Sequence, residues 1–135
     1  ERFRLENPDG TIAHAEFQIG NSIVMTFDAE EDWPPTPSFL RLYVENGDAF
    51  FSRSIAAGCT PVTNMTELFF GERVGRVKDK WGNLWWIHTR IADLDPEELA
   101  RRAADPVFID SMRYVQWSLR EEMRTRFGFE NRPIT

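Results

Sequence analysis

The sequence lacks the features of a disulfide-bonded, secreted or membrane-spanning protein. Its 135 residues include one cysteine, Cys59, so no disulfide can form within the chain. It has no apolar run approaching the roughly 20 residues of a membrane-spanning helix, and its first residues do not show the basic and then apolar layout of a signal peptide. We therefore expect a cytoplasmic protein without a membrane partner.

Positive charge is also scarce. Lys and Arg number 16 against 22 Asp and Glu, which gives a formal net charge of -6. Because affinity for nucleic acid rests mainly on cationic side chains that neutralise phosphates, we expect no nucleic-acid partner. Aromatic residues are abundant instead, with eleven Phe and five Trp, and such rings either fill a core or line a small-molecule pocket.

The first part of the chain predicts an antiparallel meander. Strand-like segments occupy residues 2–6, 11–19 and 22–28, with turn residues at 7–10 and 20–21. The segment from Asp32 to Pro37 then carries three prolines, which cannot donate ladder hydrogen bonds. It is typical of a stiff linker between two segments.

The second part predicts a βαβββ unit. A strand at residues 38–45 leads into a short helix in which Phe51 and Ile55 share a face, and Gly58 ends this helix. Three further strands are expected at about residues 60–64, 73–79 and 83–90. Because the first part carries only three strands, we expect the first module to lack its opening strand and helix.

A helical extension is predicted from residue 93 onward. Asp95 offers an N-cap and Pro96 a first helical residue, and the pair Asp105 and Pro106 repeats this pattern. The second helix, about residues 106–127, carries an apolar stripe made of Phe108, Met112, Val115, Leu119 and Met123. Such a stripe must cover either its own sheet or a second subunit, and the sequence leaves both possibilities open.

One stretch of the sequence resembles a known family. The segment from Gly71 to Ile87 resembles the closing β-hairpin of PhnB-like proteins of the vicinal-oxygen-chelate superfamily, which includes glyoxalases, bleomycin-resistance proteins and extradiol dioxygenases. Residues 39–45, Asp48 and residues 56–59 resemble that family's strand and helix, and residues 14–25 resemble its earlier hairpin.

The resemblance implies an α+β fold. In this family βαβββ modules form strongly curved sheets that make a half-open barrel around a ligand cavity, which is often completed by dimerisation. Residues 1–92 would form this domain, with a partial first module at 1–31 and a second module at 38–92. Residues 93–135 would form the helical extension.

The resemblance also locates the positions that hold a metal ion in metal-dependent members. They fall here on Phe39, on Trp86, and on Val24 or Met25, while the first-strand position is missing. None of these side chains supplies the oxygen or imidazole donors that a hard or borderline divalent metal needs. We therefore predict no cofactor, and a metal-free cavity whose aromatic floor suits a flat or apolar molecule.

Strand alternation selects the side chains that would face this cavity. Phe39, Arg41 and Tyr43 share one face of their strand, because residues two apart lie on the same side. Arg41 can stack on rings and bind a carboxylate or phosphate, or it can form a structural ion pair with an acidic residue such as Glu16. The predicted ligand-binding residues are Phe39, Arg41, Tyr43, Trp86 and Met25.

The candidate catalytic residues are His14, Glu16 and His88. His14 and Glu16 share a strand face, so they can form an acid/base pair or, with His88, a displaced metal site. The alternative is that His14 and Glu16 lie on a solvated sheet face and that His88 forms part of a rim.

Three functions are compatible with these features. The first is a protein that binds or sequesters a small aromatic or anionic molecule, and this interpretation is favoured. The second is a metal-dependent lyase, isomerase or dioxygenase with a rearranged site, and the third is an interaction module that uses the C-terminal helices. A fold alone does not choose among them. The sheet edge left by the missing strand predicts a homodimer.

Overall fold

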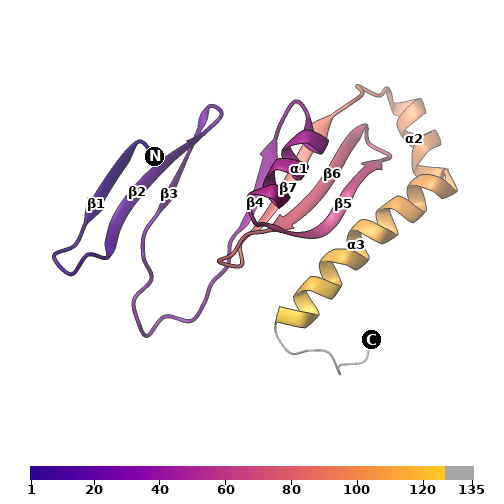
Figure 1. The fold of residues 1–135 in the computed structure, drawn as a ribbon. Coiled ribbons are helices and arrows are strands. Elements are labelled where there is room, and N and C mark those ends of the chain that lie inside the picture. Colours follow the sequence, from indigo (N-terminus) through magenta and orange to yellow (C-terminus); the bar gives the residue numbers. More distant parts are fainter. Residues whose placement is uncertain (127–135) are drawn as a thin grey trace. The chain divides into compact units, whose positions relative to one another are not determined.

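The protein folds into two compact units, residues Glu1–Thr36 and Pro37–Thr135. A computed structural model gives the structure of residues 1–126, and residues 127–135 lie outside the described part (Figure 1). Each unit has its own sheet. Within residues 1–126 no helix combines the length and the apolar character needed to cross a membrane.

The first unit is a three-stranded antiparallel sheet in the order β1-β2-β3. Its strands are β1 (Phe3–Glu6), β2 (Ile12–Ile19) and β3 (Ser22–Thr26). The turn between β1 and β2 closes with a hydrogen bond from Gly10 N to Asn7 O at 3.0 Å. The predicted meander is confirmed.

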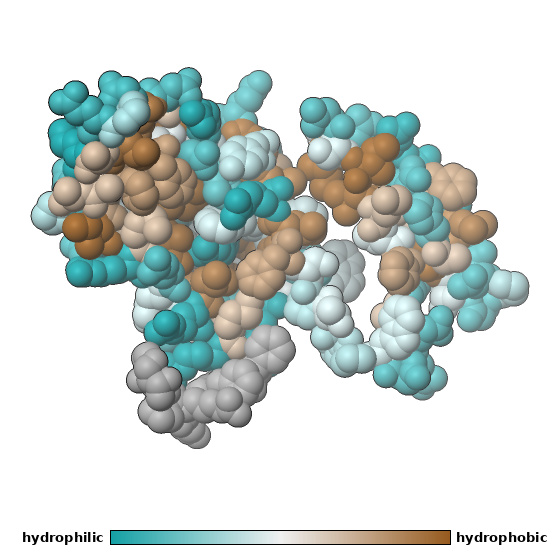
Figure 2. Space-filling view, turned by 180° about the vertical axis from the view of Figure 1, so that it is seen from behind, coloured by the Kyte–Doolittle hydropathy of each residue, from teal (hydrophilic) through white to brown (hydrophobic). Residues whose placement is uncertain are grey.

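The two faces of this sheet differ in character. Ala15 is buried on one face, whereas the other face carries His14 and Glu16 among exposed apolar side chains. The register pairs Phe3 and Met25 with Glu16, and both apolar side chains are at least half exposed. Apolar residues also gather over this unit in the space-filling view (Figure 2).

The second unit contains the predicted βαβββ order. It consists of β4 (Phe39–Tyr43), α1 (Gly47–Ala56), β5 (Thr60–Leu68), β6 (Glu72–Lys78) and β7 (Leu84–Arg90). The sheet order is β4-β7-β6-β5, with β4 parallel to β7 and the other pairs antiparallel. The mixed architecture confirms the predicted α+β fold class.

Strand β5 is longer than the sequence predicted. It continues past Asn64 to Leu68, so the predicted end at Asn64 is wrong. Its pairing with β6 shifts register between Pro61 and Thr63, and again between Thr63 and Thr66. Such irregularities interrupt the regular alternation of side chains, and for this reason the pattern of residues did not indicate the full strand.

Helix α1 packs closely on one face of the second sheet. Asn46 caps the helix, because its side-chain oxygen accepts a hydrogen bond from Ala49 N at 2.9 Å. A Cβ atom at Gly47 would lie 2.7 Å from Met65 Cε and 2.7 Å from Thr89 Oγ1. The absence of a side chain at Gly47 therefore allows the helix to approach β5 and β7.

The C-terminal helices are α2 (Pro96–Ala104) and α3 (Pro106–Arg126). As predicted, Asp95 caps α2, and its carboxylate accepts a hydrogen bond from Glu98 N at 2.8 Å. The predicted end of the second helix, Phe127, lies outside the described residues. Helix α3 runs along β5 (Figure 1).

Helix α3 covers its own sheet, on the face opposite α1. Gly75 and Ile87 lie toward α1, whereas their neighbours Arg76 and Trp86 contact α3 or the core beneath it. That core joins Val115 of α3 to Leu68 and Val74 of the sheet. The apolar stripe on α3 is therefore used within the chain.

Polar side chains at a spacing of four residues also fasten α3 to the sheet. Tyr114 Oη accepts a hydrogen bond from Asn64 N at 2.9 Å, and Ser118 Oγ lies 2.7 Å from Thr63 Oγ1. One turn further on, Glu122 accepts a hydrogen bond from Lys78 at 2.8 Å. Residues four apart share a helix face, so these three contacts form one row beside the apolar stripe.

Replacing Gly71 should destabilise the second unit strongly. Gly71 has a φ of 82°, and an added Cβ would collide with the carbonyl oxygen of Ala92. We expect Gly71→Ala to lower the free energy of unfolding by more than the about 1–3 kcal/mol of backbone strain alone. Gly58→Ala is the matched control, because Gly58 has a φ of 99° and open space around its Cβ position. If urea unfolding shows the same loss of free energy for both variants, the predicted collision at Gly71 is contradicted.

Candidate functional site

Side chains from three strands form a row across the face of the sheet that α3 partly covers. In the strand register Arg41 of β4 lies opposite Trp86 of β7, and Trp86 lies opposite Arg76 of β6. We call these three residues the Trp86 row. The next row along the strands contains Tyr43, His88 and Val74. Phe39, Arg41 and Tyr43 thus share a face with Trp86, as strand alternation and the family resemblance together predicted.

The Trp86 indole lies between two guanidinium groups. The Arg41 Cζ atom is 4.3 Å from the ring centroid, and the Arg76 Cζ atom is 4.2 Å from it. Because Arg41 and Arg76 belong to the strands on either side of β7, one guanidinium stands on each flank of the ring. Both interactions are favourable, since a cation is attracted to the electron-rich face of an indole.

Arg76 is a buried cation without a carboxylate partner. Its side chain is only 3% exposed, and its guanidinium donates to Thr63 Oγ1 at 3.1 Å and to the Val115 carbonyl at 2.8 Å. Within residues 37–126 neither Arg76 nor Arg41 forms an ion pair. Burial, and then repulsion from Arg41, lower the pKa of Arg76 to about 10. The group therefore stays charged at neutral pH.

His88 and Glu72 form a buried pair next to the Trp86 row. His88 Nδ1 lies 2.6 Å from Glu72 Oε2, and the imidazole is 4.7 Å from the Trp86 ring and 4.9 Å from the Tyr43 ring. His88 is 3% exposed, so the expectation that it lies on a rim is wrong. Burial lowers its pKa, as do the charges of Arg41 and Arg76, against the opposing effect of Glu72.

Three buried nitrogen atoms in this region have no hydrogen-bond partner within the described part of the chain. They are Arg76 Nε, Trp86 Nε1 and His88 Nε2. Buried polar groups are normally paired, because an unpaired one costs about 1–3 kcal/mol. Side chains of β4 beside them remain open to solvent, with Phe39 58% and Tyr43 63% exposed. The arrangement is aromatic, cationic and incompletely hydrogen-bonded.

The other candidate residues lie in the first unit. His14 Nε2 is 3.2 Å from Glu16 Oε1, and both side chains are about one-third exposed. Met25 lies opposite Glu16 and is 66% exposed. The carboxylate that contacts His88 is Glu72 rather than Glu16. Among residues 1–126 no group of three or more His, Cys, Asp or Glu side chains is arranged to hold a metal ion.

The positions where metal-dependent relatives hold their ion do not fit a metal here. Phe39 and Trp86 share one face of the second sheet, and neither carries an oxygen or imidazole donor. Met25 offers only a thioether, which suits soft metals and not the hard or borderline ions of oxygen and nitrogen sites. The side chains at the inherited positions therefore supply ring surface in place of ligands.

Sequence reasoning missed Glu72 and Arg76, although a signal was present. The turn from Asp79 to Gly82 closes with a hydrogen bond from Gly82 N to Asp79 O at 3.0 Å, and it aligns β6 with β7. Counting back from this turn places Arg76 directly opposite Trp86. The register of the β6–β7 hairpin could thus be predicted from the sequence. That register was not used to predict which side chains of β6 share a face with Trp86.

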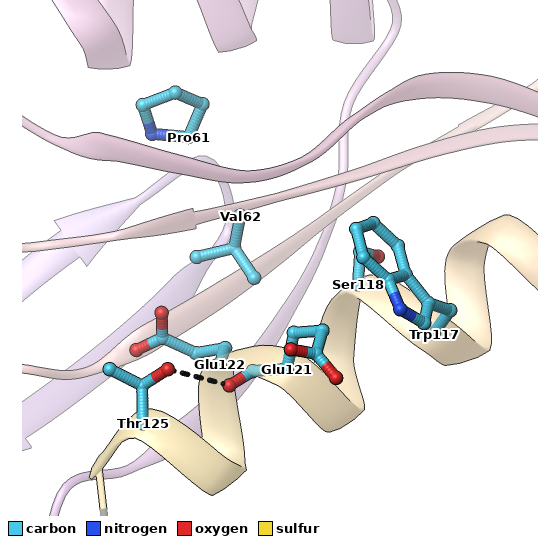
Figure 3. A pocket seen from close by; sticks show the side chains of 7 residues that line it. All are labelled: Pro61, Val62, Trp117, Ser118, Glu121, Glu122 and Thr125. Atoms are coloured by element: carbon cyan, nitrogen blue, oxygen red, sulfur yellow. Dashed lines mark hydrogen bonds between the residues drawn. The ribbon is translucent and has the colours of Figure 1, made fainter. Parts of the chain in front are cut away.

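A concave feature lies between β5 and α3. It is an open depression of about 220 Å³ (Figure 3). Its lining consists of Pro61, Val62, Trp117, Ser118, Glu121, Glu122 and Thr125. Glu122 is already occupied by Lys78 and Arg126, each at 2.8 Å. None of the lining residues belongs to the Trp86 row.

Known proteins resemble this chain in sequence. It is 30% identical over 107 residues to the uncharacterized protein Mb0911c of Mycobacterium bovis, and the match covers 71% of this chain and 70% of that protein. Protein Rv0887c of Mycobacterium tuberculosis is also 30% identical over 107 residues, and the chain spans 63% of its length. No protein-family model matches the chain.

Solved structures resemble it in fold. TioX from Micromonospora sp. ML1 shares 30% identity at a TM-score of 0.51, and the match covers 64% of this chain and 76% of TioX. Protein PA1353 from Pseudomonas aeruginosa shares 18% identity at a TM-score of 0.51, over 62% of this chain and 66% of that one. The second likeness concerns the fold alone.

The βαβββ module, with its parallel β4 and β7 strands, defines a vicinal-oxygen-chelate fold. The chain belongs to the same family as Mb0911c and TioX, and its fold is that of the PhnB-like vicinal-oxygen-chelate proteins.

The lowered pKa of His88 predicts that stability depends on pH. The folded state favours the neutral imidazole, so the unfolded chain binds more protons once the pH falls below the ordinary value of 6.5. The free energy of unfolding should therefore decrease as the pH falls from 7 to 5. His88→Gln should flatten this slope in urea unfolding, whereas His14→Gln should retain it. An unchanged slope in His88→Gln would contradict the assignment.

Proposed function

We propose that this protein binds a small aromatic anion at the Trp86 row, without a metal ion. The observation that carries the proposal is the indole of Trp86 held between two guanidiniums that lack a carboxylate partner within residues 37–126. A buried cation is costly unless an anion compensates it, and Arg76 is the buried member of this pair. An anionic ligand would supply the missing charge.

Exposure indicates from which side such a ligand arrives. Arg76 is covered by α3, so it does not contact the ligand directly. It contributes to binding through its positive charge and by holding the Trp86 indole in place. Arg41, in contrast, is exposed on β4, and its guanidinium can turn two parallel donors toward a carboxylate or phosphate. Arg41 is therefore the direct anion contact in this proposal.

The aromatic side chains explain why a flat molecule is favoured. Phe39 and Tyr43 stand on either side of Arg41 along β4 and expose more than half of their surface. Rings of this kind offer offset or edge-to-face contacts to a planar ligand. Met25, in the first unit, is 66% exposed, and its role in ligand binding stays a prediction from the family resemblance.

The proposal includes a cytoplasmic homodimer. The sheets of both units end in unpaired edge strands, and the first unit exposes Phe3, Leu5, Ile23 and Met25 on one face. Apolar faces and open edges are ordinarily covered by further protein. A second copy of this chain is the partner we propose.

Charge neutralisation should dominate binding. We expect 2-naphthoate to bind to the wild-type protein, and Arg41→Gln to weaken it about tenfold or more, since hydrogen bonds to charged groups contribute about 1.5–3 kcal/mol. Arg41→Gln should weaken the binding of the uncharged analogue 2-naphthylmethanol much less than the binding of 2-naphthoate. Calorimetric titration measures both ligands.

The matched control is Arg53→Gln. Arg53 is an exposed arginine of α1 whose guanidinium also stacks on a ring, that of Phe50 at 5.6 Å, but it lies away from the Trp86 row. This variant should bind 2-naphthoate like the wild type. Equal weakening in both arginine variants, or no binding to the wild type, would overturn the proposed function.

Metal content and oligomeric state can be measured on one chromatographic peak. Protein purified without chelator should elute with the mass of a dimer by light scattering and without stoichiometric metal by elemental analysis. Stoichiometric zinc, nickel, manganese or iron that is lost in His14→Ala would instead support the metal-dependent alternative. A monomer would contradict the proposed homodimer.

A further inference from the structure

His88 presents a buried hydrogen-bond acceptor that has no donor within the described part of the chain. Its Nδ1 atom lies 2.6 Å from Glu72 Oε2, while its Nε2 atom is buried and unpaired. An ionised carboxylate can only accept hydrogen bonds, so Nδ1 must carry the proton of a neutral imidazole. Nε2 then keeps the lone pair.

The charges around His88 favour this neutral form. Burial lowers the pKa of His88, and both guanidiniums of the Trp86 row act in the same direction because they repel a proton on the imidazole. Glu72 alone opposes this effect, and it does so from the Nδ1 side. The geometry and the surrounding charges both indicate that Nε2 is a hydrogen-bond acceptor without a donor among the described residues.

We propose that the ligand of this site carries a hydroxyl or N–H group besides its anionic group, and that His88 Nε2 accepts the hydrogen bond from it. This inference rests on the proposed function and narrows the ligand to planar aromatic acids with a second, protic substituent. Arg41 binds the anion, the exposed rings of Phe39 and Tyr43 contact the aromatic ring, and His88 Nε2 accepts the hydrogen bond from the protic group. Glu72 is a positioning residue, because it fixes which nitrogen of His88 is free.

Tyr43 is the exposed ring beside the His88 imidazole. Its ring lies 4.9 Å from the imidazole on the open side of the sheet, and 63% of its surface is exposed. The opposite side is closed, because Val74 lies beside His88 and packs under α3. An exposed ring can change rotamer at little cost, so a ligand that displaces Tyr43 reaches His88 from the β4 side.

The test begins with the protonation state of His88 in the free protein. Long-range proton–nitrogen NMR distinguishes the two neutral tautomers directly, and the chain has only two histidines to assign. We expect the Nδ1–H form of His88 at pH 7.5. An Nε2–H form or an imidazolium at that pH overturns the inference, and this measurement needs no variant.

The second measurement compares hydroxy-2-naphthoates with their methyl ethers, isomer by isomer. A methoxy group keeps the oxygen but cannot donate, so only the hydroxyl satisfies Nε2. For at least one isomer we expect the hydroxyl compound to bind about two- to tenfold tighter, as one net hydrogen bond provides. If each hydroxyl compound binds like its ether, water or nothing satisfies Nε2 and the inference fails.

Glu72→Gln provides the control for positioning. Glutamine keeps the size of the side chain, but its amide can donate to Nδ1 and release the constraint on the tautomer. The preference for the hydroxyl compound should shrink, while 2-naphthoate itself should bind within about twofold of the wild type, because Arg41 is untouched. Binding of 2-naphthoate without any hydroxyl preference refutes only this inference. Failure of every naphthoate to bind refutes the proposed function as well.

Discussion

The buried guanidinium of Arg76 is the constraint on which the arrangement of the second unit depends. It contacts the Trp86 ring on one side, and it donates to Thr63 and to the Val115 carbonyl of α3 on the other. One charged group thus joins β6, β7, β5 and α3. Because no carboxylate within residues 37–126 compensates it, its charge is held by dipoles and by the indole face, which are weaker partners than an anion.

This uncompensated charge explains the state of its neighbours. Burial, together with the charges of Arg41 and Arg76, lowers the pKa of His88 and favours its neutral imidazole, while Glu72 determines which of its nitrogens carries the proton. Buried nitrogens without a partner among residues 1–126 remain on both Trp86 and His88. A fold optimised for stability alone would pair or remove such groups, and their concentration on one face is typical of a place where function opposes stability.

Local signals predicted most of the fold, and non-local pairing set the limit. The Asp95 and Pro96 start of α2 and the order of the strands followed from residues close in sequence, whereas the shared face of Phe39 and Trp86 followed from the family resemblance. The extension of β5 to Leu68 did not, because its register shifts are decided by pairing with β6. Arg76 and Glu72 were not predicted for a related reason, since their roles depend on which residues lie opposite them in a neighbouring strand.

Helix α3 also decides which half of the sheet can receive a ligand. Its polar contacts at Tyr114, Ser118 and Glu122 hold it over β5 and β6, so that half of the face is occupied by the chain itself. The β4 half remains open and carries the exposed aromatic side chains beside Arg41. A sequence pattern of apolar stripes could not distinguish a helix that covers its sheet from one that covers a partner. The polar row could, because a side chain at Tyr114 or Ser118 that bonds to β5 leaves α3 no freedom to dock elsewhere without breaking those bonds. Any ligand of this face would therefore have to bind over β4 and β7, where Arg41, the exposed rings of Phe39 and Tyr43, and His88 lie in adjacent rows.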